Sequence, residues 1–147
     1  MAHTGMTTAP LRGTTDTGGL GIRFMRWLLA INLGLVALQA LSAGFLLSGD
    51  GRAVTAHATV AVGLLVGVLV QGVAAIVLWR RRRVPPWVAR FSVGLIVIVF
   101  LQMGLGQNKR YWLHVPVGVG LFGWLARQET RLGTLWRTTG ARPLYLS

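Results

Sequence analysis

The chain has 147 residues, of which 53% are hydrophobic and only 12% are charged. This composition is typical of an integral membrane protein, and the length leaves no room for a soluble catalytic domain beside the apolar segments. A net charge of +12 suggests a nucleic-acid partner in a soluble protein, but here the basic residues bracket the apolar segments and no nucleic-acid binding is expected. The absence of cysteine excludes disulfides, thiolate metal sites and covalently attached c-type haem.

The N-terminal segment, residues 1–21, is rich in threonine and glycine and has no apolar periodicity, which predicts a disordered tail. Arg23 and Arg26 then open an apolar stretch of about 20 residues, longer than the hydrophobic region of a signal peptide. We interpret this stretch as a retained membrane span. Cleavage near Ala40–Ala43 is the weaker alternative.

Four membrane spans are predicted by the apolar runs, at about residues 27–47, 54–79, 87–106 and 111–126. Turn residues or prolines separate the first three, and the last span is only about 24 Å long at the helical rise. Pro116 lies inside this last span, where neighbouring helices make a kink tolerable. The sequence therefore predicts an all-α integral membrane four-helix bundle over residues 22–126, running up-down-up-down, with a C-terminal tail over residues 127–147.

The basic residues indicate how the spans are oriented. One side of the predicted membrane carries Arg12, Arg23, Arg26, Arg80 to Arg83, Arg90, Arg127, Arg131, Arg137 and Arg142, whereas the other carries Arg52, Lys109 and Arg110. The positive-inside rule then places both termini in the cytoplasm of a multi-pass protein of the cell (plasma) membrane. The four consecutive arginines either only fix this orientation, which we favour, or bind anionic lipid or an acidic partner.

Four polar side chains, one from each span, are predicted to lie in one layer of the outer half of the membrane. They are Gln39, His57, Gln102 and His114. Polar groups inside a span are costly unless they are paired, so they indicate either hydrogen bonds between helices or a functional site. A b-type haem explains why two of the four are histidines, because His57 and His114 on facing helices supply two axial ligands to the haem iron. Gln39 and Gln102 then form a supporting polar layer.

Small residues follow both histidines. They are Ala58, Ala61, Gly63 and Gly67 after the first, and Gly118, Gly120 and Gly123 after the second. Close helix packing explains them better than clearance for a macrocycle, and Gly63 with Gly67 also matches a motif that can form a homodimer. Asn32 and Gln71, in the inner half, are expected to hydrogen-bond across helices without any chemical role.

An internal repeat leads to a resemblance. Leu38-Gln39, a glycine and His57 are echoed by Leu101-Gln102, a glycine and His114. This arrangement resembles one four-helix half of haem A synthase and, more widely, the small bis-histidine transmembrane cytochromes. The resemblance covers about residues 27–126 and implies that His57 and His114 are haem ligands. The family has two such halves, whereas this chain has one. The family also has an acidic residue shortly before the first histidine, and this chain has Ala53 and Val54 at that place.

Two functions are therefore expected from the sequence. The first is a small membrane protein that binds haem b between His57 and His114, for electron transfer or haem handling at the outer leaflet. The alternative is a non-enzymatic membrane scaffold or accessory subunit whose histidines are structural. The sequence assigns no enzymatic activity, and beyond the lipid bilayer it leaves a homodimer or a larger membrane complex open as partners.

Overall fold

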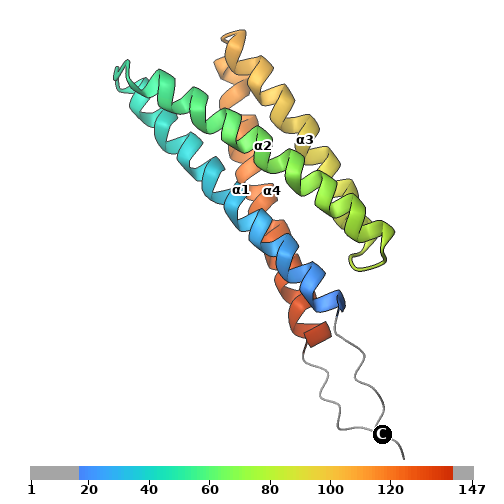
Figure 1. Ribbon diagram of the computed structural model, residues 1–147. Coiled ribbons are helices and arrows are strands. Elements are labelled where there is room, and N and C mark those ends of the chain that lie inside the picture. The colour runs from blue at the N-terminus through green and yellow to red at the C-terminus, as the bar shows by residue number, and fades with distance from the viewer. Residues whose placement is uncertain (1–16, 141–147) are drawn as a thin grey trace, which may run out of the picture.

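The computed structural model describes residues 17–140, which are entirely helical apart from short turns (Figure 1). The helices are α1 (Thr17–Leu47), α2 (Ala53–Arg80), α3 (Pro86–Gln107) and α4 (Tyr111–Gly140). Helix α1 packs against α2 and α4, and α3 also packs against α2 and α4. Helices α2 and α4 therefore lie diagonally opposite each other.

Three of the four helices are long and apolar enough to cross a membrane, namely α1 from Gly19, α2 and α3. The predicted spans at residues 27–47, 54–79 and 87–106 fall inside these helices. Large apolar side chains cover the outside of the molecule, including Ile31, Val62, Val97 and Val119, each more than half exposed. An apolar exterior of this extent is suited to lipid rather than to water.

The three turns end their helices in the same way. Gly49, Arg82 and Lys109 each have a positive φ, and the next residue donates its N–H to a carbonyl five positions back. This is the Schellman arrangement, which satisfies the free carbonyls at a helix end. A left-handed residue costs little at Gly49 but is unfavourable at Arg82 and Lys109, so the turn geometry outweighs that cost at both positions.

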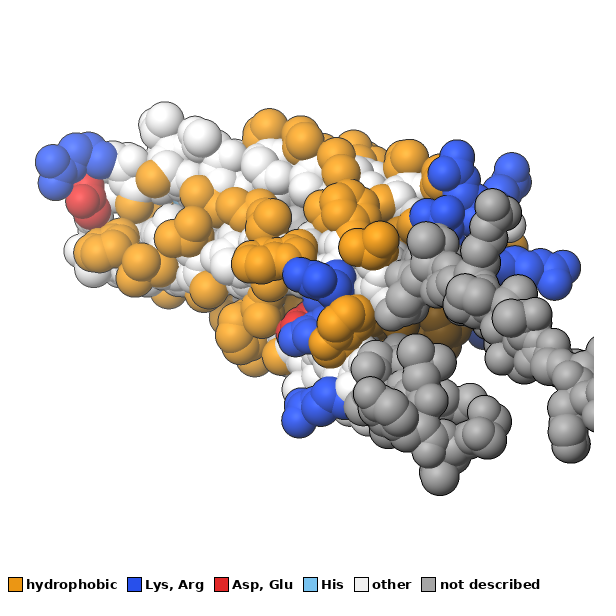
Figure 2. All heavy atoms as spheres, turned by 60° about the horizontal axis from the view of Figure 1, so that its bottom comes forward, with side chains coloured by type: hydrophobic (Ala, Val, Ile, Leu, Met, Phe, Trp, Pro, Cys, Tyr) orange, Lys and Arg blue, Asp and Glu red, His pale blue; other side chains and the backbone are white. Residues whose placement is uncertain are grey.

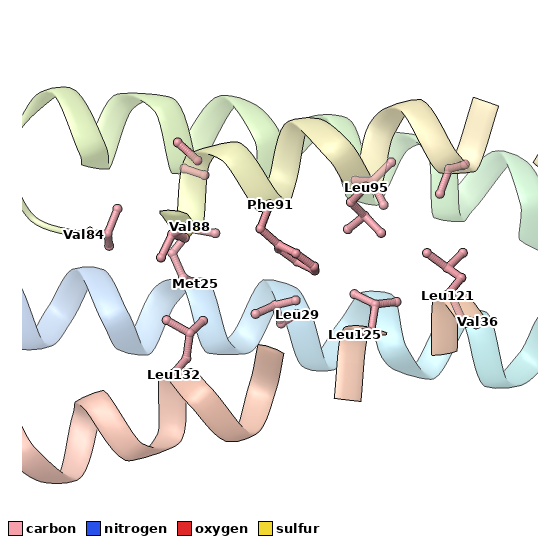
Figure 3. Close-up of a cluster of buried hydrophobic side chains, with 14 of the residues drawn as sticks. Met25, Leu29, Val36, Val84, Val88, Phe91, Leu95, Leu121, Leu125 and Leu132 are labelled. Carbon is pink, nitrogen blue, oxygen red and sulfur yellow. The ribbon is translucent and has the colours of Figure 1, made fainter. Parts of the chain in front are cut away.

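The apolar core runs from one end of the molecule to its middle, and Figure 3 shows side chains of α1, α3 and α4 meeting in it. Met25, Leu29, Leu95, Leu125 and Leu132 are its largest fully buried apolar side chains. The end of the molecule at which the core begins includes the start of α1, the α2–α3 turn with Arg80 to Arg83, and the end of α4. We call it the arginine end. Figure 2 shows basic side chains gathered there, with an apolar surface separating them from the opposite end.

A buried polar chain crosses three helices within the core. The Asn32 side-chain amide donates to Gln71 Oε1 at 2.8 Å, and the Gln71 amide donates to Ser92 Oγ at 3.3 Å. All three side chains are fully buried. The predicted hydrogen bonding of Asn32 and Gln71 across helices is confirmed.

Two helices extend beyond the boundaries expected from hydropathy. Helix α1 begins at Thr17, inside the predicted tail, and α4 continues past Ala126 to Gly140. The continuation of α4 is held against α1 by Leu132, which is fully buried, and by an ion pair between Arg26 and Glu129 at 2.7 Å. Figure 1 shows the start of α1 and the end of α4 projecting together beyond the α2–α3 turn.

Candidate cofactor site at the histidine pair

The structure brings His57 and His114 together at the end of the molecule opposite the arginine end, which we call the histidine end. Their ring centres are 6.2 Å apart and the ring planes are inclined at 68°. The two rings come from the diagonal helices α2 and α4, so they approach each other across the middle of the helix assembly. Both side chains are half-buried.

His57 is held by a serine of α1. Ser42 Oγ lies 2.9 Å from His57 Nδ1 and 3.0 Å from the backbone carbonyl of Gln39. A carbonyl can only accept, so the serine hydroxyl donates to the Gln39 carbonyl and accepts a hydrogen bond from His57 Nδ1–H. Gln39 contributes mainly through its backbone, because its side-chain oxygen is 3.5 Å from the same hydroxyl.

His114 is held by the backbone and side chain of one residue of α3. Its Nδ1 lies 3.0 Å from the carbonyl oxygen of Gln102, and the Gln102 amide donates to the His114 carbonyl at 3.0 Å. Gly118 and Gly106 allow this approach. A Cβ at Gly118 would stand 2.8 Å from the Gln102 amide nitrogen, and one at Gly106 would stand 3.2 Å from the His114 ring.

These contacts assign the same protonation pattern to both imidazoles. In each ring Nδ1 faces an oxygen that requires a proton on the nitrogen, so the lone pair is left on Nε2. Metal-ligating histidines use this arrangement, in which an oxygen partner fixes the tautomer and leaves the other nitrogen to bind metal. Among the described residues, neither Nε2 has a hydrogen-bond partner in the protein.

The histidine end lacks the dense core that fills the arginine end. Within residues 37–63 and 100–120, Ala53 is the only apolar side chain that is buried. Gly44, Gly104 and Gly120 have no atom within 4 Å of the position where a Cβ would stand. Few buried side chains therefore pack around the two histidines.

The predicted small residues serve different purposes. Gly67 packs against Asn32 and Leu35 of α1, and Gly118 packs against Gln102, as expected for close helix contacts. A Cβ at Gly63 would stand 4.0 Å from the Leu35 side chain, so Gly63 and Gly67 both face α1 of the same chain. Gly120 and Gly123 have open space beside them.

The donor set indicates which kind of metal centre fits. Within residues 17–140 no group of three or more His, Cys, Asp or Glu side chains gathers, whereas protein zinc sites use three or four such ligands. A haem iron needs only axial ligands from the protein. His57 and His114, with ring centres 6.2 Å apart, are the two side chains of the described residues that would hold such an iron.

Charged side chains at the histidine end lie in the two turns. Arg52 contacts Asp50 at 3.2 Å, and this contact, with the Arg52 backbone N–H, lowers the pKa of Asp50 below its usual value. Lys109 and Arg110 are exposed, one turn before His114, and neither forms an ion pair within residues 17–140. They are the cations at this end that no carboxylate of the described chain neutralises.

The sequence singled out four site residues, and their contacts are now defined. His57 and His114 lie side by side, Gln102 contacts His114, and Ser42 links Gln39 to His57. Ser42 was missed by sequence reasoning. It lies one turn after Gln39 on α1, and this spacing is the only signal in the sequence that places it beside the polar layer.

Known proteins offer no direct guide to this site. No family model, no curated protein and no solved structure matches the chain.

Proposed function

We propose that this chain is a small integral membrane protein that binds one b-type haem between His57 and His114. The observation that carries the proposal is the paired geometry of the two imidazoles. They come from diagonal helices and their ring centres are 6.2 Å apart. Within residues 17–140, each has Nδ1 hydrogen-bonded to an oxygen and an Nε2 atom without a hydrogen-bond partner. Two neutral imidazoles in this arrangement suit the axial positions of a haem iron.

The lack of buried apolar side chains around the pair supports the same proposal. A packed protein interior normally leaves few spaces larger than a water molecule. The arginine end follows this rule, whereas the histidine end holds only Ala53 and Ser42 as buried side chains among residues 37–63 and 100–120. A flat apolar cofactor would add the apolar burial that this end lacks.

Each residue then has a defined task. His57 and His114 would hold the iron, Ser42 and the Gln102 backbone would orient the rings, and Gln102 would tie α3 to α4 beside the site. Lys109 and Arg110, exposed in the turn before α4, would be available to neutralise haem propionates. When bound, the haem would supply one-electron redox chemistry, which suits electron transfer or haem handling near one membrane surface.

We also propose the membrane arrangement in which α4 is the fourth span of an up-down-up-down bundle with both termini in the cytoplasm. The arginine end then faces the cytoplasm and the haem lies in the outer half of the bilayer. This placement agrees with the resemblance to one half of haem A synthase and to small bis-histidine cytochromes. A chain with one such half has one haem position, so an electron crossing the whole membrane would need a partner.

The test is a reduced-minus-oxidised absorption spectrum of the detergent-purified full chain. We expect Soret and α-bands in the wild type and their loss in His57→Ala and in His114→Ala. His3→Ala is the matched control, because it removes a histidine far along the chain from the pair, and it should keep the bands. A protein that stays colourless after haem is supplied would overturn the proposal.

The edge-to-face contact of the rings supports a second candidate, a membrane scaffold in which the histidines only hold helices together. In that case His57→Ala would lower thermal stability without any spectroscopic signal from haem. The haem proposal instead requires that the Soret and α-bands be lost when either histidine is replaced.

A further inference from the structure

The second half of α4 forms one side of a hollow at the arginine end. This hollow has a volume of about 380 Å³ and is lined by Trp87 at the start of α3 and by Arg131, Thr134 and Leu135 of α4. It lies far along α4 from His114, so it does not belong to the histidine site.

The hollow results from the way α4 packs. Towards its end α4 follows α1, to which Leu132 and the Arg26–Glu129 ion pair fasten it. Helix α3 begins only at Pro86, after the arginine turn, and its last close ring contact with α4 is between Phe91 and Trp124, 4.8 Å apart. Beyond this contact the two helices separate, and Figure 1 shows the end of α4 beside α1 and away from the α2–α3 turn.

One basic side chain, Arg131, lines the hollow. Asp50 and Glu129 are the carboxylates of the described residues, and each is already paired, with Arg52 and Arg26 respectively. Arg131 is exposed and forms no ion pair within residues 17–140, and the same is true of Arg90 and Arg127 nearby in the sequence. The ligand that best complements this site is therefore an anion.

The neutral lining residues indicate what kind of anion fits. Trp87 and Leu135 offer apolar surface beside the arginine, and tryptophan is enriched where a protein crosses the membrane–water interface. The Thr134 hydroxyl donates to the Thr130 carbonyl at 3.1 Å, so towards the hollow it can only accept a hydrogen bond. A suitable ligand therefore has three parts. It has a negatively charged phosphate for Arg131, an apolar portion for Trp87 and Leu135, and a hydrogen-bond donor near the phosphate for Thr134.

We infer that this hollow binds the headgroup of one anionic phospholipid, with the phosphate at Arg131, a headgroup hydroxyl at Thr134 and the upper acyl region against Trp87 and Leu135. Phosphatidylglycerol has the required chemistry. The site is independent of the haem, since it shares no residue with the histidine pair.

Native mass spectrometry of the full chain tests the inference. The protein is released from micelles that hold equal amounts of phosphatidylglycerol and phosphatidylcholine, and the ratio of the two lipids retained is measured. We expect one phosphatidylglycerol to be retained in preference. Arg131→Gln should lower the ratio about five-fold, the factor that corresponds to one basic side chain near an anionic surface.

Arg137→Gln is the matched control, because it removes the same charge from the same helix at a position that does not line the hollow. It should leave the ratio unchanged, whereas Arg131→Lys should keep most of the preference. Both arginines are exposed, so neither change threatens folding. Circular dichroism of each variant verifies this.

Several outcomes would overturn the inference. Equal losses in Arg131→Gln and Arg137→Gln would mean that the lipids respond only to overall charge. Displacement of the lipid by an equal concentration of inorganic phosphate would identify a free-anion site. Binding of a polyglutamate peptide without any preference for phosphatidylglycerol would identify a docking site for an acidic protein segment.

Discussion

Ser42 and His57 form a hydrogen bond of 2.9 Å between α1 and α2, and this serine is the hydrogen-bond partner that the described residues give to the His57 Nδ1 atom. The partner of His114 differs in kind, because it is the backbone carbonyl of Gln102 and survives any substitution there. A side-chain substitution can therefore remove the Nδ1 hydrogen-bond partner of His57 more easily than that of His114.

Ser42→Ala should weaken haem retention about 10- to 100-fold, the usual effect of removing an outer-shell partner of a ligating histidine. Gln102→Leu should have a smaller effect, since the Nδ1 bond of His114 remains. The measurement is haem occupancy from the Soret absorbance during titration with haem. Ser48→Ala is the control, because its hydroxyl bonds only to the exposed Phe45 carbonyl of the same helix.

Gly67 of α2 lies directly against the buried Asn32 amide, and a Cβ there would collide with Asn32 Oδ1. Gly67→Ala should therefore break the Asn32–Gln71 hydrogen bond, an interaction that contributes about 0.6 to 1.7 kcal/mol inside a membrane. The free energy of unfolding in detergent, followed by circular dichroism, measures the loss.

Gly63→Ala provides the matched control for Gly67→Ala. The same methyl group is added one turn earlier on α2, where the nearest side-chain atom is 4.0 Å away. Both variants gain the helix propensity of alanine, about 1 kcal/mol, so their difference isolates the collision with Asn32. Equal stability of the two variants would contradict the close packing of α1 and α2 at Gly67.

The sequence predicted the three long apolar helices because their hydropathy and turn residues are unambiguous. It also placed His57 and His114 at one depth, since helical rise converts chain position into depth. It could not identify Ser42 as the partner of His57, because that contact depends on how α1 is rotated about its axis. It also ended the last helix near Arg127, where hydropathy falls, although packing on α1 continues the helix to Gly140.

Asp50 provides a prediction about pH. Its hydrogen bonds to Arg52 lower its folded-state pKa below the usual 3.8, so the contact contributes stability above pH 3.8. This contribution is lost as the pH falls through the lowered value. An NMR titration should show the Asp50 carboxyl titrating below 3.8 in the wild type and closer to 3.8 in Arg52→Gln, which keeps only the backbone hydrogen bond. An unchanged titration in Arg52→Gln would contradict the contact.

The end of α4 gives the clearest test of the fold, because hydropathy predicts a tail over residues 127–147 and packing predicts a helix to Gly140. The Leu132 side chain of α4 is fully buried in the core. Leu132→Ala should therefore lower the free energy of unfolding by about 2 to 5 kcal/mol. Leu20→Ala, at the same end but 63% exposed, should change it by less than about 0.5 kcal/mol.

Amide hydrogen exchange separates a folded helix end from a tail that touches the core only occasionally. A tail exchanges quickly whatever Leu132 contributes, whereas amides near Leu132 that are bonded within α4 should open only together with α1. Leu132→Ala should therefore speed exchange over residues 127–140 and also around Arg26, the residue that binds Glu129. Acceleration confined to α4 would show that the two helix ends do not hold each other, and that the hollow lined by Trp87 is not a fixed part of the protein.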